Sequence, residues 1–389
     1  MSHSWPFVSY QPIRLVYQLY CMSALLARFP LWLVKFGLFR SLRPHREWTL
    51  QQAVMARMIR YMVDVQSRIG ITESLSLKPG KEKEKFQVVQ PAPKSFYKGP
   101  LESTVMPTTI GGTWYPKPVS KPTIKPDGCV VLHFHGGAFV IGDGRTDTLG
   151  FLANTLVQQG GVDAVFAPQY RLSGYGRSNP FPAALQDALT SYLYLVRTLD
   201  IPARNITISG DSAGGNLAIA LLRYLADFGD ELDIPNPQSS VLLSPWVSPL
   251  NSLKPDITIL SNPNYSTDLL PPSFTRWGAA TYAAIVPPSD PYITPLGNPF
   301  ATSIPIFVNQ GAVEILEIDG TQWVKEMSRV EGNRIQSEYE AAALHDTLLV
   351  GERSGWEASA QQVASKVGVF IRNTQKVSEG EFVSIPGKL

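Results

Sequence analysis

The feature that most restricts the fold of this chain is a serine enclosed by glycines, in the segment Gly210-Asp211-Ser212-Ala213-Gly214. Residues 205–208 before it are β-branched and apolar, which predicts a buried strand. Residues 216–222 after it are helix formers, which predict a helix ending near Gly229. A serine in a tight turn between a strand and a helix is the nucleophile-elbow pattern, in which glycines leave room for the turn. Such a turn places Ser212 at a helix N-terminus, where backbone N–H groups favour developing negative charge.

A second glycine-containing segment follows the strand predicted at 129–134. It reads His135-Gly136-Gly137-Ala138-Phe139. Backbone N–H groups in such a loop stabilise the oxyanion of an acyl-transfer reaction without having to reorganise. We therefore expect an oxyanion hole formed by the N–H groups of Gly136, Gly137 and Ala213.

The order of the motifs selects one histidine as the catalytic base. Chains with a nucleophile elbow order their triad as serine, then acid, then histidine, and only His345 follows Ser212. It stands after the strand predicted at 334–339, and its imidazole could take the serine proton and return it to the leaving group. His133 and His135 precede Ser212, so we interpret them as structural residues that brace the glycine loop.

The acid of the triad is expected after the strand predicted at 304–309. The candidates there are Glu314, Glu317 and Asp319. Asp319 begins an Asp-Gly-Thr-Gln segment, which is typical of a helix cap, so its predicted role is structural. The residues alone leave Glu314 and Glu317 open.

These motifs together resemble the hormone-sensitive-lipase branch of the α/β-hydrolase superfamily. The resemblance covers about residues 105–370, including Tyr-Arg-Leu at 170–172 and Ser-Pro-Trp at 244–246. The region before it is similar to that of fungal members, including steryl acetyl hydrolases. Two positions depart from the family pattern: Ala138 stands where a third glycine is usual, and residues 173–179 lengthen a loop that usually reads Ala-Pro-Glu.

The resemblance implies an α/β-hydrolase fold, with a mostly parallel central sheet, helices on both faces and a helical cap. It also implies a serine carboxyl-ester hydrolase that uses no metal and no cofactor. The segment Gly311-Ala-Val-Glu-Ile-Leu matches the family's acid segment, with Glu in place of Asp and Ile in place of Pro. This match implies Glu314 as the acid, with Glu317 as the second choice.

The expected reaction begins with attack of Ser212 on an ester carbonyl and passes through an acyl-enzyme. The expected substrates are small hydrophobic esters with short, acetyl-type acyl groups, such as esters of a fungal secondary metabolite or a sterol. One alternative is a biosynthetic-pathway hydrolase that acts on a metabolite without net ester hydrolysis. Another is a ligand receptor on the same fold, which predicts loss of a triad residue, whereas Ser212 and His345 are both present.

Alternating strand and helix patterns predict a parallel sheet from about residue 105 onward. We expect residues 1–75 to form an N-terminal helical cap, 76–104 an exposed linker and 105–389 the catalytic domain. A Pro- and aromatic-rich insertion at 250–290 is expected to complete the cap. Residues 49–65 predict an amphipathic helix, whose methionines we interpret as packing residues. The net charge of +2 gives no sign of a nucleic-acid partner.

The N-terminal residues 13–40 combine an apolar run with basic and aromatic side chains. The run from Leu15 to Ala27 is short for a membrane span, and Arg28 and Pro30 interrupt its continuation. The pattern favours a helix lying in a membrane interface, with a cap helix and a true span as alternatives. With only two distant cysteines and no evident signal peptide, the expected location is intracellular, in the cytoplasm or on a membrane such as the endoplasmic reticulum.

Overall fold

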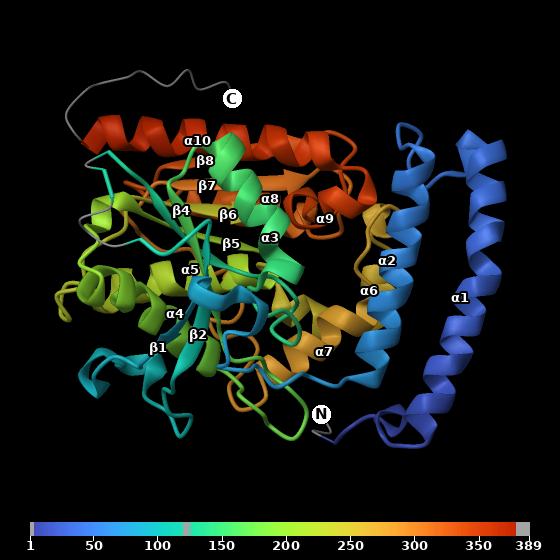
Figure 1. Ribbon diagram of the computed structural model, residues 1–389, viewed down its shortest axis with the longest axis horizontal. Coiled ribbons are helices and arrows are strands. Elements are labelled where there is room, and N and C mark those ends of the chain that lie inside the picture. The colour runs from blue at the N-terminus through green and yellow to red at the C-terminus, as the bar shows by residue number, and fades with distance from the viewer. Residues whose placement is uncertain (1–3, 120–123, 126, 379–389) are drawn as a thin grey trace.

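The computed structural model describes residues 4–119, 124–125 and 127–378, and an eight-stranded sheet forms its centre (Figure 1). The strand order is β1-β2-β4-β3-β5-β6-β7-β8. The pairs β1–β2 and β2–β4 are antiparallel, and all other neighbours are parallel. The strands are β1 (Phe86–Val89), β2 (Ile110–Tyr115), β3 (Val130–Phe134), β4 (Ala164–Gln169), β5 (Ile206–Asp211), β6 (Ser239–Leu243), β7 (Ile306–Gly311) and β8 (Ile335–Glu340). This is the predicted fold class.

Helices cover both faces of the sheet, as expected for parallel strands that are buried on two sides. Figure 1 shows α10 along one side of the sheet and α4 and α5 on the other. The helices are α1 (Ile13–Leu38), α2 (Leu50–Ile69), α3 (Thr146–Thr155), α4 (Ala183–Leu193), α5 (Ser212–Phe228), α6 (Asp256–Leu260), α7 (Pro272–Tyr282), α8 (Glu317–Met327), α9 (Thr347–Ser354) and α10 (Glu357–Ser378).

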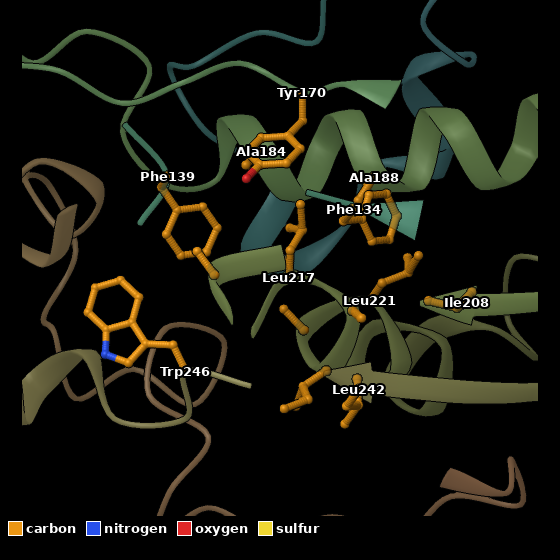
Figure 2. Packing of buried hydrophobic residues seen from close by; sticks show 14 of the residues in the cluster. Phe134, Phe139, Tyr170, Ala184, Ala188, Ile208, Leu217, Leu221, Leu242 and Trp246 are labelled. Atoms are coloured by element: carbon orange, nitrogen blue, oxygen red, sulfur yellow. The ribbon is translucent and has the colours of Figure 1, made fainter. Parts of the chain in front are cut away.

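Two apolar clusters form the core, one on each face of the sheet. Successive strand residues point to opposite faces: Val131 of β3 belongs to the cluster under α3 and α10, whereas its neighbours Val130 and Leu132 belong to the cluster under α4 and α5. Figure 2 shows part of the cluster under α4 and α5, where Leu217 and Leu221 of α5 lie among side chains of α4 and the central strands. The core therefore fixes α5, and with it the turn that precedes α5.

Part of the predicted exposed linker belongs to the fold. Within residues 76–104, β1 pairs with β2 at the edge of the sheet. Glu82 just before β1 is buried and accepts hydrogen bonds from the backbone N–H and the hydroxyl of Thr146 at the start of α3. The Lys- and Glu-rich composition of this segment indicated a solvated loop, but composition alone does not show that one of its carboxylates caps a helix.

The N-terminal helices form a layer beside the catalytic body. Figure 1 shows α1 and α2 side by side, with α2 between α1 and the rest of the molecule. The hydroxyl of Tyr61 in α2 donates to the carbonyl of Cys21 in α1 over 2.9 Å. Helix α1 continues through Arg28 and Pro30 to Leu38, beyond the interruption that the sequence pattern indicated.

The N-terminal layer meets the insertion at 250–290. The Arg60 guanidinium donates to the backbone carbonyls of Tyr265 and Asp268, and Ser67 hydrogen-bonds Ser273 over 2.7 Å. These contacts join α2 to the loop before α7 and to α7 itself. Two segments far apart in the sequence thus lie together over one end of the sheet.

Trp48 connects this layer to the loop between β8 and α9. Its indole is 1% exposed, donates to the carbonyl of Ala342 over 2.6 Å and packs edge-on against Trp356 at 5.5 Å. Because removal of a buried tryptophan leaves a cavity, Trp48→Ala should lower the free energy of unfolding by about 3–5 kcal/mol. Urea denaturation measures this change. The matched control is Trp5→Ala at a 37% exposed position, and a loss as large in the control would contradict the expectation.

Candidate active site

Ser212 occupies a strained turn between β5 and α5. It is the first residue of α5, and its φ of 50° lies in the left-handed region that residues with side chains rarely adopt. Both flanking glycines are required: a Cβ on Gly210 would collide with the backbone of Gly214, and a Cβ on Gly214 with the carbonyl of Phe134. The close backbone approach of β5, α5 and β3 therefore produces the predicted elbow.

Glu314 and His345 form a buried hydrogen-bonded pair. Glu314 follows β7 and His345 follows β8, so both lie at the carboxyl edge of the parallel strands, as Ser212 does. His345 Nδ1 lies 3.0 Å from Glu314 Oε2, and the two residues are 4% and 0% exposed. Burial lowers the pKa of His345, but the hydrogen bond and charge of Glu314 raise it more, so the net pKa lies above the ordinary value of 6.5.

The other candidate acids have different partners. Glu317 is the first residue of α8, and its carboxylate accepts from the hydroxyl of Thr321 over 2.9 Å. Asp319 accepts from the side-chain amide of Asn251 over 2.9 Å. Of the three predicted candidates, the structure brings Glu314 to His345.

Asp268 adds a second buried carboxyl group near the histidine. It lies in the insertion at 250–290 and accepts hydrogen bonds from the backbone N–H groups of Leu269, Leu270 and Ile315. Its charge raises the pKa of His345 further. Sequence reasoning missed this residue, because a single aspartate in a Pro-rich insertion has no motif around it.

The loops that carry Ser212 and His345 are joined through short contacts. The backbone N–H of Asp346, directly after His345, donates to the hydroxyl of Ser244 over 3.2 Å. The N–H of Trp246, two residues after Ser244, donates to the carbonyl of Ser212 over 2.9 Å. The segment after β6 therefore joins the turn of Ser212 to the loop of His345.

The glycine loop that carries the predicted oxyanion-hole donors lies against the elbow. A Cβ on Gly136 would lie 3.1 Å from Cβ of Ser212, so the loop passes directly beside the serine. Gly136 also lies beside the Asp211 carboxylate, because a Cβ on Gly136 would be 2.2 Å from Asp211 Oδ2. Its N–H stays a predicted donor of the oxyanion hole. The N–H groups of Gly137 and Ala138 have no protein partner among the residues that the structure describes. Ala213 lies in the first turn of α5, where N–H groups have no intrahelical partner.

A second serine–histidine–aspartate chain lies inside the sheet. His133 Nδ1 is 3.0 Å from Ser209 Oγ, and His133 Nε2 is 3.0 Å from Asp211 Oδ1. All three side chains are 0% exposed, and burial lowers the pKa of His133 to about 3. No substrate can reach Ser209 at that depth, so His133 has the structural role that the sequence predicted.

His135 braces the glycine loop. Its ring stacks on Tyr170 at 4.2 Å, and Nδ1 donates to the carbonyl of Gly136 over 2.7 Å. The hydroxyl of Tyr170 in turn donates to the carbonyl of His135 over 2.6 Å. Burial lowers the pKa of His135 to about 4, which keeps it neutral and suits a structural residue.

A cavity of about 490 Å³ opens beside the glycine loop, and we call it the α2 pocket. Gly136, Gly137 and Ile141 line one wall, and the start of α3 and part of α9 line others. The wall facing the loop comes from α2, through Met55, Met58, Ile59 and Met62. Helical periodicity identified this apolar face of α2, and the structure shows that three of its methionines line a cavity. No group of three metal-ligating side chains occurs in the described part of the chain.

The raised pKa of His345 gives a testable pH dependence. A fluorophosphonate labels a serine whose base is neutral, so labelling of Ser212 should increase as pH rises through the pKa of His345. Glu314→Gln removes the charge that raises this pKa, and the midpoint should therefore move to lower pH. Glu317→Gln is the matched control and should leave the midpoint unchanged. Mass spectrometry of the adduct at a series of pH values measures both midpoints, and a shift in the control alone would mean that Glu317 is the acid.

Comparison with known proteins agrees with this architecture. A family model described as alpha/beta hydrolase fold matches residues 131–349. An acetyl-hydrolase from Streptomyces hygroscopicus is 31% identical over 193 residues, which cover 50% of this chain and 60% of that protein. An ethyl acetate hydrolase from Pseudomonas putida is 28% identical over 229 residues, covering 58% of this chain and 67% of that protein.

A crystal structure of an esterase from the bacterial hormone-sensitive lipase family superposes with a TM-score of 0.59 at 21% identity, covering 84% of this chain and 99% of that one. At this level of identity, the superposition shows that the two proteins share a fold. The alignment with the Streptomyces relative spans less than two thirds of that protein's length. The family model, by contrast, spans more than half of the 389 residues and includes the glycine loop, the elbow, Glu314 and His345. The chain therefore belongs to the alpha/beta hydrolase fold family.

Proposed function

We propose that this protein is a serine carboxyl-ester hydrolase. The observation that carries the proposal is the buried His345–Glu314 pair, hydrogen-bonded over 3.0 Å at the same edge of the sheet as the strained elbow of Ser212. A carboxylate that holds Nδ1–H of an imidazole leaves Nε2 free to act as a base. The relatives named acetyl-hydrolase and ethyl acetate hydrolase support the same reaction class.

In the proposed mechanism, Ser212 attacks the ester carbonyl while His345 takes its proton. Glu314 orients the imidazole and stabilises its charged form. The N–H groups of Gly136, Gly137 and Ala213, with that of Ala138, stabilise the oxyanion. His345 then protonates the leaving alcohol, and an acyl-enzyme remains. Water, activated by the same histidine, releases the acid and restores Ser212.

The proposed substrates are small hydrophobic esters with short acyl groups. The α2 pocket supports this choice, because methionines form one of its walls and it begins at the glycine loop that lies against Ser212. A volume of about 490 Å³ is in the range of ordinary small-molecule sites. Methionine side chains adapt to irregular apolar ligands, which suits an ester of a terpenoid, a sterol or another apolar metabolite.

We also propose that α1 attaches the protein to a membrane surface. By length and composition α1 could cross a membrane, and only 11% of its most apolar stretch is buried. Exposed apolar side chains run along the whole helix: Leu15, Val16, Leu19, Tyr20, Met22, Leu26, Phe29, Leu31, Leu33, Val34 and Leu38. The first acidic residue of the chain is Glu47, whereas six arginines and lysines precede it. This cationic, apolar surface suits anionic lipid.

The placement of α1 favours a helix lying in the interface over one crossing the bilayer. Helix α2 lies beside α1 and belongs to the catalytic body through Arg60 and Ser67. A spanning α1 would draw α2, with its partly exposed Arg57 and Arg68, into hydrocarbon, which is costly for charged groups. An interfacial α1 keeps α2 at the membrane surface, next to the pocket that it lines.

The proposed reaction requires Ser212. Ser212→Ala should lower kcat for p-nitrophenyl acetate on the order of 10³-fold or more with the fold retained, because no other group can form the acyl-enzyme. Ser209→Ala, at a buried serine of β5 just before the elbow, is the matched control and should keep its activity. A Ser212→Ala enzyme that still turns over, or a control that is equally inactive, would reject this assignment.

The α2 pocket should determine which acyl or alcohol groups fit. Met58→Trp adds bulk to the pocket wall, so kcat/KM should fall about tenfold or more for p-nitrophenyl esters of long acids and change much less for the acetate. Met106→Trp, at a 51% exposed position outside the pocket, is the control. A uniform loss across chain lengths would mean that substrates do not occupy this cavity.

Membrane attachment is tested on the full-length protein. Leu19 and Leu26 are 60% and 68% exposed on one face of α1. The double variant Leu19→Glu, Leu26→Glu should sediment less with vesicles containing phosphatidylserine than the unchanged protein does. Val369→Glu, an exposed apolar residue of α10, serves as the control. If the α1 variant and the control sediment alike, α1 has no membrane role.

A further inference from the structure

The insertion at 250–290 is hydrogen-bonded to the loop that carries Glu314, residues 312–316, which we call the acid loop. Three side chains of the insertion donate to successive backbone carbonyls of this loop: Thr267 to Val313 over 2.7 Å, Asn264 to Glu314 over 3.0 Å and Asn262 to Ile315 over 3.0 Å. In the opposite direction, the backbone N–H of Ile315 donates to the Asp268 carboxylate. Residues 262–268 therefore contact the polar backbone groups on either side of Glu314.

The other side of the acid loop is bonded to the loop that leads to the base. The N–H of Ala312 donates to the carbonyl of Glu340 over 3.0 Å, and the N–H of Val313 donates to the carbonyl of Ala343 over 3.1 Å. Ala343 lies two residues before His345. The acid loop thus lies between the loop of the base and residues 262–268, and each neighbour bonds a different set of its backbone groups.

The carboxylate of Glu314 has little support of its own. Its Oε2 lies 3.0 Å from Nδ1 of His345, and its Oε1 has no hydrogen-bond partner among the described residues. A glutamate side chain is long and loses much rotamer freedom when it is ordered. Since the carboxylate is not fixed by further bonds, the position of the backbone at 314 decides whether it meets the imidazole.

The bond between Ile315 and Asp268 depends on a departure from the family pattern, because Ile315 stands where that pattern has proline. A proline ring fixes its own φ and has no N–H, whereas isoleucine leaves φ free and supplies a donor. Asp268 accepts this donor together with the N–H groups of Leu269 and Leu270, and it is 2% exposed. In this chain a tertiary hydrogen bond therefore restricts a position that a proline ring would restrict locally.

Residues 262–268 are bonded in turn to α2. Nη1 of Arg60 donates to the carbonyls of Tyr265 and Asp268, and its guanidinium lies 3.8 Å from the centre of the Tyr265 ring. Arg60 is 9% exposed, so these bonds form away from water, where hydrogen bonds of a charged donor are strong. A series of printed contacts thus leads from α2 through residues 262–268 to the backbone of Glu314.

We propose that residues 262–268 position Glu314 for its hydrogen bond to His345, with Thr267 and Asp268 as buried positioning residues, and that Arg60 of α2 fixes this segment against the acid loop. The N-terminal layer then supports the catalytic pair without contributing a group to it. The inference rests on the proposed function only in that Glu314 and His345 are taken as acid and base. Small misplacements of such groups are costly to the rate.

The first test is Thr267→Val in the full-length protein. This change keeps the shape of the side chain and removes the hydroxyl that donates to Val313. The kcat should fall about tenfold with little change in KM, because orientation rather than binding is lost. Ser261→Ala is the matched control, because this exposed hydroxyl of the same insertion donates to the carbonyl of Thr258 instead. A Thr267→Val enzyme with the kcat of the unchanged protein would overturn the proposal.

The pH profile separates positioning from a general loss of stability. Thr267→Val changes no charge, so a shift in the pH midpoint of Ser212 labelling reports a change in geometry. A displaced Glu314 stabilises the charged imidazole less, the pKa of His345 falls, and the midpoint should move to lower pH, in the direction expected for Glu314→Gln. A lower kcat with an unmoved midpoint would mean that Thr267 is only structural, and the proposal would fail.

The role of α2 is tested by Arg60→Met, which should lower both kcat and the midpoint. Arg57→Met is the matched control: it removes the same charge one turn earlier in α2, at a residue that lines the same cavity, whereas the bonds to Tyr265 and Asp268 come from Arg60. Equal effects of the two variants would show that charge rather than positioning is responsible, which would overturn the assignment of Arg60.

Proton NMR reports on the catalytic pair without any substrate. The low-field resonance of His345 Nδ1–H, assigned by its loss in His345→Ala, should shift or weaken in Thr267→Val and stay unchanged in Ser261→Ala. A protein in which the resonance responds in this way but which hydrolyses no ester would refute the proposed function and support this inference. A protein that hydrolyses esters and keeps the resonance unchanged in Thr267→Val would refute this inference and leave the proposed function intact.

Discussion

The close packing of three backbones around Gly210 and Gly214 is the constraint on which the site depends. No Cβ fits at either position, so β5 can turn directly into α5 only because both residues are glycine. That turn forces Ser212 into the left-handed region and brings it against the glycine loop after β3. The apolar core holds the strain in place, because Leu217 and Leu221 of α5 are fully buried between the sheet and α4.

Four carboxyl groups lie buried around this turn. Glu314, Asp268, Asp211 and Asp346 are all buried, and His345 is the titratable base that they share. Burial alone would keep the imidazole neutral and the carboxyl groups protonated. The hydrogen bond and charge of Glu314 raise the pKa of His345 in spite of its burial, whereas burial raises the pKa of Glu314 to about 7 and that of Asp268 above its ordinary value. The arrangement gives the histidine a basicity that an isolated buried imidazole lacks.

The N-terminal layer lies between this site and the surface of the molecule. Helix α2 presents three methionines to the pocket and packs beside α1, whose apolar side chains remain largely exposed. Trp48, which lies just before α2, hydrogen-bonds the loop that leads to His345. Helix α2 therefore lies between α1 and the pocket, and the segment just before it contacts the loop that leads to His345.

The sequence by itself determined the fold class, the elbow at Ser212 and the alternation of strands and helices, because glycine spacing and apolar periodicity are local properties of the chain. Motif order and family resemblance also singled out His345 and Glu314, which the structure places together. Only the tertiary structure decided that Met58 faces a cavity, and that Asp268 and Asp346 lie near the histidine. These contacts depend on which side chains from distant strands come together in the low-dielectric interior. Local sequence patterns do not determine such long-range contacts.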